Sequence, residues 1–295
     1  MRKLDYNQIK EVFNSKIFEN SRGDLISKLS KYPERYIGLF RPTKPKTKII
    51  QNITQSHEIK FGDAFEILIR KVFEIFNYRT LELMDVDEQG NVYNYDQLFM
   101  LNNELIFIEQ KVRDDHDSTK KRGQIENFEK KLNLLLTKYK CKIRCYFYFI
   151  DPSLKKNRNY YLSELAKIEE SYGVNAKLCY ADDLFEYENL KDVWEGEIIS
   201  FLKQWRDELP DMPEVNFDKA SSETMKELSE IKPLVFRKLF ENEELVKTIF
   251  PILFPDKIVL RKLNILFEEK ISEGGNTLKI YTSLKSQLNK AMTLY

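Results

Sequence analysis

Three charged residues stand out in the stretch YDQLFMLNNELIFIEQK, which covers residues 95 to 111. Asp96 stands at the head of one apolar run, and Glu109 and Lys111 stand near the end of the next. Because side chains alternate between the two faces of a strand, Glu109 and Lys111 point to one face and Gln110 to the other. A hairpin that only fills a core has no need for these charges, so the three residues are candidates for chemistry.

The chemistry depends on how close the three side chains come. A turn-like Asn-Asn pair separates the two runs, so the stretch predicts a β-hairpin in which Asp96 lies beside the far end of the second strand. Two carboxylates and one ammonium then converge at an edge of a sheet, where carboxylates raise each other's pKa until a cation joins them. Oxygen ligands without Cys or His favour Mg²⁺ or Mn²⁺ over zinc. A carboxylate-bound Mg²⁺ beside a lysine is suited to phosphodiester hydrolysis, because the ion polarises the phosphate and activates water.

Asp96, twelve intervening residues and then Glu109-Gln110-Lys111 together resemble the signature of the PD-(D/E)xK nuclease superfamily, which includes type II restriction endonucleases. The order of the predicted elements is similar over the core but not at the two ends. The resemblance implies DNA as substrate and Mg²⁺-dependent cleavage that leaves a 5′-phosphate. It also implies that Asp96 and Glu109 hold the metal and that Lys111 assists the attacking water. One departure is Tyr95, which stands where the signature has proline.

Two further residues resemble site residues of that superfamily. In GDAFE, Glu66 lies near the start of the helix predicted before the hairpin, and the resemblance implies that it adds a carboxylate to the metal site. The alternative is a surface ion pair with Arg70, one helical turn further on. Gln124 opens the helix predicted after the hairpin and is similar to a glutamine that some members place beside the active site. The alternative for Gln124 is an exposed residue at the start of a helix.

Charge is balanced over the whole chain but not along it. The 295 residues include 48 Lys plus Arg and 47 Asp plus Glu, so the net charge gives no argument for nucleic-acid binding. Residues 119–144, however, hold nine basic and two acidic side chains. A polar loop after Lys111 and a basic connection before the core are predicted to contact DNA. The residues concerned are Lys120, Lys121, Arg122, Gln124, Arg41, Lys44 and Lys46.

Not every lysine in the basic stretch is expected to bind DNA. Lys130, Lys131 and Lys138 fall on a predicted amphipathic helix, and lysines there usually keep a helix face in water. For these three we expect a solvated surface.

The remaining patterns predict the elements that position the hairpin. Apolar residues at helical spacing predict helices within residues 1–40, from Phe61 and from Ile125. RPTKPKTKIIQNITQSH, with two prolines, predicts an extended connection. CKIRCYFYFI predicts a buried strand, and NAKLCY predicts another that follows a helix ending at Gly173. The order predicts an α/β fold with a restriction-endonuclease-like core, a mixed sheet flanked by helices.

Three regions follow from this reading of the chain. We expect an N-terminal helical segment and basic linker over residues 1–55, and a nuclease core over 56–190. A helical region over 191–295 is expected to recognise DNA, to dimerise, or both.

The composition excludes several other classes of protein. Two His and three Cys are too few for a His-based metal cage, a zinc site or a disulfide framework. No signal core and no run of eighteen apolar residues occurs, so we expect a cytoplasmic protein without a membrane partner. No phosphate-binding loop of the ATPase kind is present, which argues against a helicase-coupled nuclease.

The sequence therefore favours a Mg²⁺-dependent type II restriction endonuclease that cuts a short, specific double-stranded sequence as a homodimer. Mn²⁺ is expected to substitute for Mg²⁺. Two alternatives stay open. One is a structure-selective nuclease of DNA repair or recombination with the same chemistry, and the other is a non-catalytic DNA-binding or scaffold protein whose charged hairpin is only an ion-pair cluster.

Overall fold

The computed structural model describes residues 4–295, which form two compact units. Unit 1 contains the described residues up to Phe13 and residues 61–209, and unit 2 contains residues 14–60 and 210–295. This division differs from the predicted boundaries of 1–55, 56–190 and 191–295. Most of the predicted N-terminal and C-terminal regions, which are far apart in sequence, together form unit 2.

Unit 1 is built on a five-stranded mixed sheet in the order β1-β4-β5-β6-β7. Its strands are β1 (Arg79–Thr80), β4 (Gln97–Leu101), β5 (Glu104–Lys111), β6 (Lys142–Phe149) and β7 (Asn175–Tyr180). β1, β4 and β5 pair antiparallel, whereas β5, β6 and β7 pair parallel. The predicted hairpin is confirmed as β4 and β5. Asn102 and Asn103 form its turn with φ values of 49° and 63°, a left-handed conformation that asparagine tolerates.

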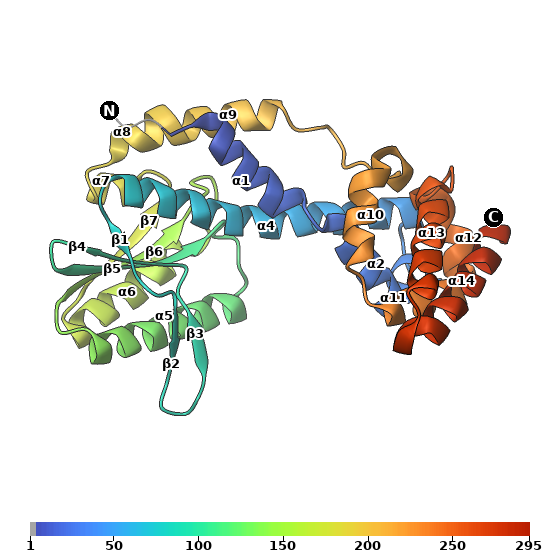
Figure 1. Ribbon diagram of the computed structural model, residues 1–295. Helices are drawn as coiled ribbons and strands as arrows, with labels where there is room; N and C mark the ends of the chain where they lie inside the picture. The colour runs from blue at the N-terminus through green and yellow to red at the C-terminus, as the bar shows by residue number, and fades with distance from the viewer. Residues whose placement is uncertain (1–3) are drawn as a thin grey trace. The chain divides into compact units, whose positions relative to one another are not determined.

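Helices cover both faces of this sheet (Figure 1). The C-terminal part of α4 (Pro45–Ile75) lies on one face, and α5 (Ser118–Lys138) and α6 (Arg158–Tyr172) lie on the other. Phe107 of β5 stacks on Phe128 of α5, while Phe99 of β4 stacks on Phe73 of α4. The predicted α/β class, a mixed sheet flanked by helices, is therefore confirmed, and it is compatible with a restriction-endonuclease-like core.

Smaller elements complete unit 1. They are the first part of α1 (Tyr6–Phe18), the separate hairpin of β2 (Met84–Val86) and β3 (Val92–Asn94), α7 (Asp183–Tyr187), α8 (Lys191–Val193), the π-helix η1 (Trp194–Ile198) and α9 (Ile199–Asp207). Gly173 ends α6 with a φ of 63°, as predicted. Phe13 of α1 packs edge-on against Phe61 of α4 and Trp205 of α9, which ties these helices together.

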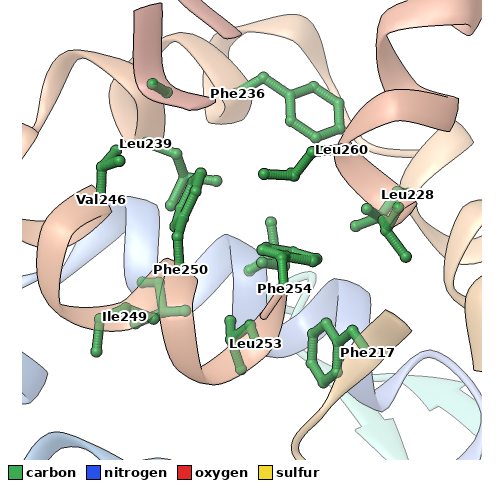
Figure 2. Close-up of a cluster of buried hydrophobic side chains, with 14 of the residues drawn as sticks. Phe217, Leu228, Phe236, Leu239, Val246, Ile249, Phe250, Leu253, Phe254 and Leu260 are labelled. Carbon is green, nitrogen blue, oxygen red and sulfur yellow. The ribbon is translucent and has the colours of Figure 1, made fainter. Parts of the chain in front are cut away.

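Unit 2 is a helical bundle, in agreement with the helices predicted at both ends of the chain. It combines the first part of α4 with α2 (Ser21–Lys31), α3 (Glu34–Ile37), η2 (Phe217–Ala220), α10 (Ser221–Ser229), α11 (Pro233–Glu241), α12 (Glu243–Leu253), α13 (Ile258–Ser272), η3 (Gly275–Thr277) and α14 (Leu278–Thr293). Figure 2 shows side chains from η2 and α10 to α13 converging in its apolar core. None of the helices in residues 4–295 is both long and apolar enough to cross a bilayer.

Two segments that were predicted to be non-helical are partly helical. The basic stretch read as an extended connection begins α4 at Pro45, because proline is tolerated at the first helical position and Ile49 and Ile53 share a buried face. The polar loop predicted after Lys111 is shorter than expected. Asp117 caps α5 by accepting hydrogen bonds from the N–H groups of Thr119 and Lys120, so the helix starts at Ser118.

Candidate active site

Asp96 precedes β4, and the register of the hairpin brings it to the end of β5. Gln97 pairs with Ile108, so Asp96 lies beside the last residues of the neighbouring strand. Its Oδ2 accepts a hydrogen bond from the backbone N–H of Gln110 at 2.7 Å, and Lys111 Nζ lies 3.0 Å from the same oxygen. The backbone contact fixes the carboxylate in place, because it depends on strand pairing and not on a flexible side chain.

The Glu109 carboxylate lies between two ammonium groups. Lys111 Nζ is 2.8 Å from Oε1, and Lys131 Nζ of α5 is 2.6 Å from Oε2. The side chains of Glu109 and Lys131 are only 3% and 6% exposed. The predicted convergence of Asp96, Glu109 and Lys111 is therefore confirmed, although it lies at the end of β5, the central strand, and not on an edge strand. A second lysine that the sequence reasoning missed, Lys131, joins the three residues.

The prediction that Lys131 lies on a solvated helix face is wrong. Lys131 follows Phe128 by three residues and precedes Leu135 by four, so it falls on the apolar stripe of α5, which packs on the sheet. A lysine buried there needs an acceptor, since an unpaired buried charge is strongly unfavourable. Its position within the apolar stripe was the signal that could have identified it.

Other basic residues of the 119–144 stretch are also held by acidic partners. Lys138 Nζ lies 2.9 Å from Asp85 Oδ2, and Arg144 contacts Glu104 at 3.1 Å and Glu188 at 2.9 Å. The local excess of positive charge that the sequence indicates is therefore partly neutralised within unit 1.

Glu66 of α4 lies within electrostatic reach of this cluster. Burial, followed by the charges of Asp96 and Asp63, raises the pKa of the Glu66 carboxyl to about 7. Its backbone carbonyl accepts from Gln97 Nε2 at 2.6 Å, which ties this turn of α4 to the start of β4. Since α4 begins at Pro45, the prediction that Glu66 lies near the start of its helix is wrong.

The alternative for Glu66 was a surface ion pair with Arg70, but Arg70 makes other contacts. Its guanidinium donates to Gln97 Oε1 at 3.2 Å and to the Asp96 carbonyl at 3.2 Å, so it braces the start of β4. Gly62, one turn before Glu66, permits α4 to approach the end of β5. A Cβ at this position would lie 3.1 Å from Val112 Cγ2.

Lys111 is a protonated group in this setting. Burial alone would lower the pKa of its ammonium, but the charges of Glu109 and Asp96 outweigh burial and raise it. Its Nζ also donates to the Gln110 carbonyl at 2.7 Å. A lysine held in this way stabilises negative charge, and it cannot act as a proton acceptor near neutral pH.

The carboxylates of Asp96 and Glu109 are surrounded by lysine ammonium groups and not by a preformed set of metal ligands. Among the described residues, no three His, Cys, Asp or Glu side chains are placed so that they could hold a metal ion together. The possible ligands at the end of β5 are carboxylate oxygens, without Cys or His, and this donor chemistry nevertheless fits Mg²⁺ or Mn²⁺. Lys111 Nζ is the cation that Asp96 and Glu109 share.

Gln124 lies inside α5, not at its start, so that prediction is wrong. Its Oε1 accepts a hydrogen bond from the Tyr161 hydroxyl of α6 at 2.7 Å. A buried network nearby anchors the segment between β5 and α5. There, Asp114 accepts from Asn157 Nδ2 at 2.9 Å and from the Tyr180 hydroxyl at 2.9 Å. Sequence reasoning gave Asp114 no such structural role.

The predicted DNA-binding residues fall into two groups. Lys120, Lys121 and Arg122 lie in the first turns of α5 in unit 1, and Lys121 Nζ sits 4.5 Å from the centre of the Tyr160 ring. Arg41, Lys44 and Lys46 are exposed in unit 2, around the start of α4. The carboxylate cluster and the first group therefore belong to one unit, and the second group belongs to the other.

Comparison with known proteins gives evidence on the family that does not depend on the hairpin residues. The model of the HinfI family of type II restriction endonucleases matches residues 5–81. This segment includes Glu66 and the basic residues around the start of α4, but it ends before Asp96. No curated protein matches the chain. The match confirms the resemblance to type II restriction endonucleases, and it does so from a stretch that contains none of the hairpin residues.

Proposed function

We propose that the protein is a Mg²⁺-dependent type II restriction endonuclease that cuts double-stranded DNA at a short defined sequence and leaves a 5′-phosphate. The observation that carries this proposal is that two carboxylates share one cation, the ammonium group of Lys111. Lys111 Nζ lies 3.0 Å from Asp96 and 2.8 Å from Glu109 at the end of β5. The family match over residues 5–81 supports the same class of enzyme.

Each residue of the cluster has a role in this proposal. Asp96 and Glu109 would hold the metal, and Glu66, which is not yet placed with them as a third ligand, would supply a further carboxylate once it loses its proton. When bound at these residues, Mg²⁺ or Mn²⁺ would supply Lewis-acid chemistry, which polarises a phosphate and lowers the pKa of a metal-bound water. Lys111 orients the attacking water and stabilises the charge that develops on the phosphate, in keeping with its raised pKa. Lys131 fixes the rotamer of Glu109 through the contact between Nζ and Oε2.

The proposal also covers how DNA is bound. The phosphates near the cut are contacted by the start of α5, through Lys120, Lys121 and Arg122, with Gln124 one turn further along. The basic residues Arg41, Lys44 and Lys46 contact the backbone elsewhere on the duplex. A homodimer with two-fold symmetry matches a palindromic sequence and cuts both strands.

A cleavage assay on unmethylated phage DNA tests the proposal. The purified protein is incubated with Mg²⁺ or with EDTA, beside Lys111→Ala and a matched control, Lys167→Ala. Lys167 is an exposed lysine of α6 that pairs with Glu164 at 2.7 Å, far in sequence from the cluster. We expect discrete fragments that need Mg²⁺, that disappear with Lys111→Ala and that persist with Lys167→Ala.

The fragments themselves distinguish the alternatives. Sequencing their ends gives the recognition sequence, and direct ligation reports a 5′-phosphate. A smear that Lys111→Ala abolishes would favour a structure-selective nuclease. Intact DNA under every condition would contradict nuclease activity and leave the cluster as an ion-pair network.

A further inference from the structure

Two adjacent apolar side chains of unit 2 are almost fully exposed. Leu39 is 89% exposed and Phe40 is 95% exposed, in the segment between α3 and α4. Single exposed apolar residues are ordinary on protein surfaces, but an adjacent pair with so little contact to its own chain is not. Water is displaced favourably when a partner covers such a pair, so the two side chains are suited to binding.

The residues that follow this pair are basic. Arg41, Lys44, Lys46 and Lys48 come within the next eight positions, and Arg41, Lys44 and Lys46 are exposed. Within residues 4–295, no acidic side chain forms an ion pair with any of these three. The Arg41 Nε instead donates to the backbone carbonyl of Glu34 at 3.4 Å. Their charge is therefore available to an anionic partner.

The start of α4 reinforces this preference. The N-terminal end of a helix carries partial positive charge and normally attracts acidic side chains. The first turn of this 31-residue helix has none, and Lys46 lies there. Lysine at this end is unfavourable for the isolated helix. A bound anion such as a phosphate removes that cost, because it neutralises the lysine and meets the free N–H groups of the helix.

We propose that residues 38–48 form a DNA wedge. In this arrangement Leu39 and Phe40 enter between neighbouring base pairs and partly unstack them, while Arg41, Lys44 and Lys46 bind the flanking phosphates. Double-stranded DNA offers apolar base faces and phosphate anions a few ångströms apart, which matches an apolar tip beside cations. An apolar protein surface would leave the cations unpaired. The inference rests on the proposed function, and it assigns unit 2 a task in recognising and deforming the substrate.

Insertion between base pairs unwinds DNA, so it can be measured on any plasmid. A nicked circular plasmid is saturated with protein and closed by DNA ligase, and its linking number is then read on a gel. Ligase needs Mg²⁺, so every protein in this assay also carries Lys111→Ala to prevent cleavage. Binding to the same plasmid is measured at several salt concentrations.

Three variants separate the parts of the wedge. Leu39→Ser/Phe40→Ser removes the apolar tip, and Arg41→Gln/Lys44→Gln/Lys46→Gln removes the cations. Ile59→Ser is the matched control, since Ile59 is a 66% exposed apolar residue of α4 in the same unit. Because all these side chains are exposed, each variant is expected to unfold at the temperature of the parent.

In this assay the parent is the protein with Lys111→Ala alone. We expect this parent to lower the linking number of the plasmid, and we expect Leu39→Ser/Phe40→Ser to abolish most of that change. The tip variant is also expected to bind about tenfold more weakly at every salt concentration, with the salt dependence unchanged, because stacking involves no counterions. The variant without cations should instead reduce the slope of log K against log salt by about 2.7, at about 0.9 per charge. Ile59→Ser should match the parent in both assays.

Three results would overturn the wedge. The tip variant could retain the linking-number change and the affinity of the parent. It could also bind DNA normally while changing the oligomeric mass, which would make the apolar pair an interface between copies of this chain. If the protein with Lys111 intact cuts DNA in either case, only this inference fails. If it neither binds nor cuts DNA, the proposed function fails as well.

Discussion

Replacing Lys131 by methionine tests the buried pair that the structure places behind Glu109. The two side chains are 6% and 3% exposed, and Nζ lies 2.6 Å from Oε2. Removing one partner of a buried ion pair costs about 3–5 kcal/mol, because the other charge is left buried and unpaired. Lys111 stays on the second oxygen of Glu109, so we expect the lower end of this range, about 3 kcal/mol. Methionine fills nearly the same volume, which keeps the loss of packing small.

Urea unfolding followed by tryptophan fluorescence measures this loss. The chain has two tryptophans, Trp194 and Trp205, and both lie in unit 1, so the signal reports the unit that contains the pair. Lys138→Met is the matched control on the same helix. Its pair with Asp85 has an N–O distance of 2.9 Å, but the lysine is 42% exposed. We expect the control to lose less than about 1 kcal/mol, as exposed pairs do.

A double variant sharpens the comparison. Glu109→Gln/Lys131→Met removes both charges, so it leaves no unpaired partner at this contact. We expect it to be less destabilised than the sum of the two single variants by about 1–3 kcal/mol. Equal losses for Lys131→Met and Lys138→Met, or strict additivity of the double variant, would refute the reasoning.

Two further predictions concern stability. The pKa of Glu66, at about 7, is above its ordinary value of 4.5, so the folded state keeps this proton longer than the unfolded state does. Without metal, the free energy of unfolding should therefore fall as pH rises from about 4.5 to 7. In Glu66→Gln this fall should be smaller by about 1–2 kcal/mol, a figure that allows for solvent screening. Urea unfolding at pH 5 and at pH 8 measures the difference. Asp114→Ala should destabilise unit 1 by about 2–4 kcal/mol in the same assay, because Asn157 Nδ2 and the Tyr180 hydroxyl lose their buried acceptor. An unchanged pH profile in the first case, or an unchanged midpoint in the second, would contradict these accounts.

The charged hairpin of β4 and β5 could be predicted from sequence because its signals are local. Strand alternation fixes which face Glu109 and Lys111 share, and the Asn-Asn turn fixes where Asp96 meets them. The partner of Glu109 on α5 is Lys131, 22 residues later, and this contact depends on how α5 packs on the sheet. A lysine in an amphipathic pattern usually faces water, so a local reading of Lys131 gives the wrong environment.

The other differences also arise from context. The prolines of residues 41–57 suggested an extended chain, but Pro45 occupies the one helical position where proline costs nothing. Unit 2 unites segments from both ends of the chain. Its apolar core joins Leu25 to Leu228, and a hydrogen bond beside this core joins Arg22 to Glu227, residues about 200 positions apart. Periodicity identifies each helix alone, and it carries no information about which helices pack together.

The measurement that tests the central claim most directly is the single-turnover rate of plasmid cleavage by Lys111→Ala, beside the parent and Lys167→Ala, at saturating Mg²⁺. Lys111 contacts both Asp96 and Glu109, so its loss should lower the rate by a factor of about 10² or more while DNA binding persists. Lys167→Ala should cut at the parental rate. Cleavage by Lys111→Ala at the rate of the parent would contradict the assignment of the active site to the end of β5.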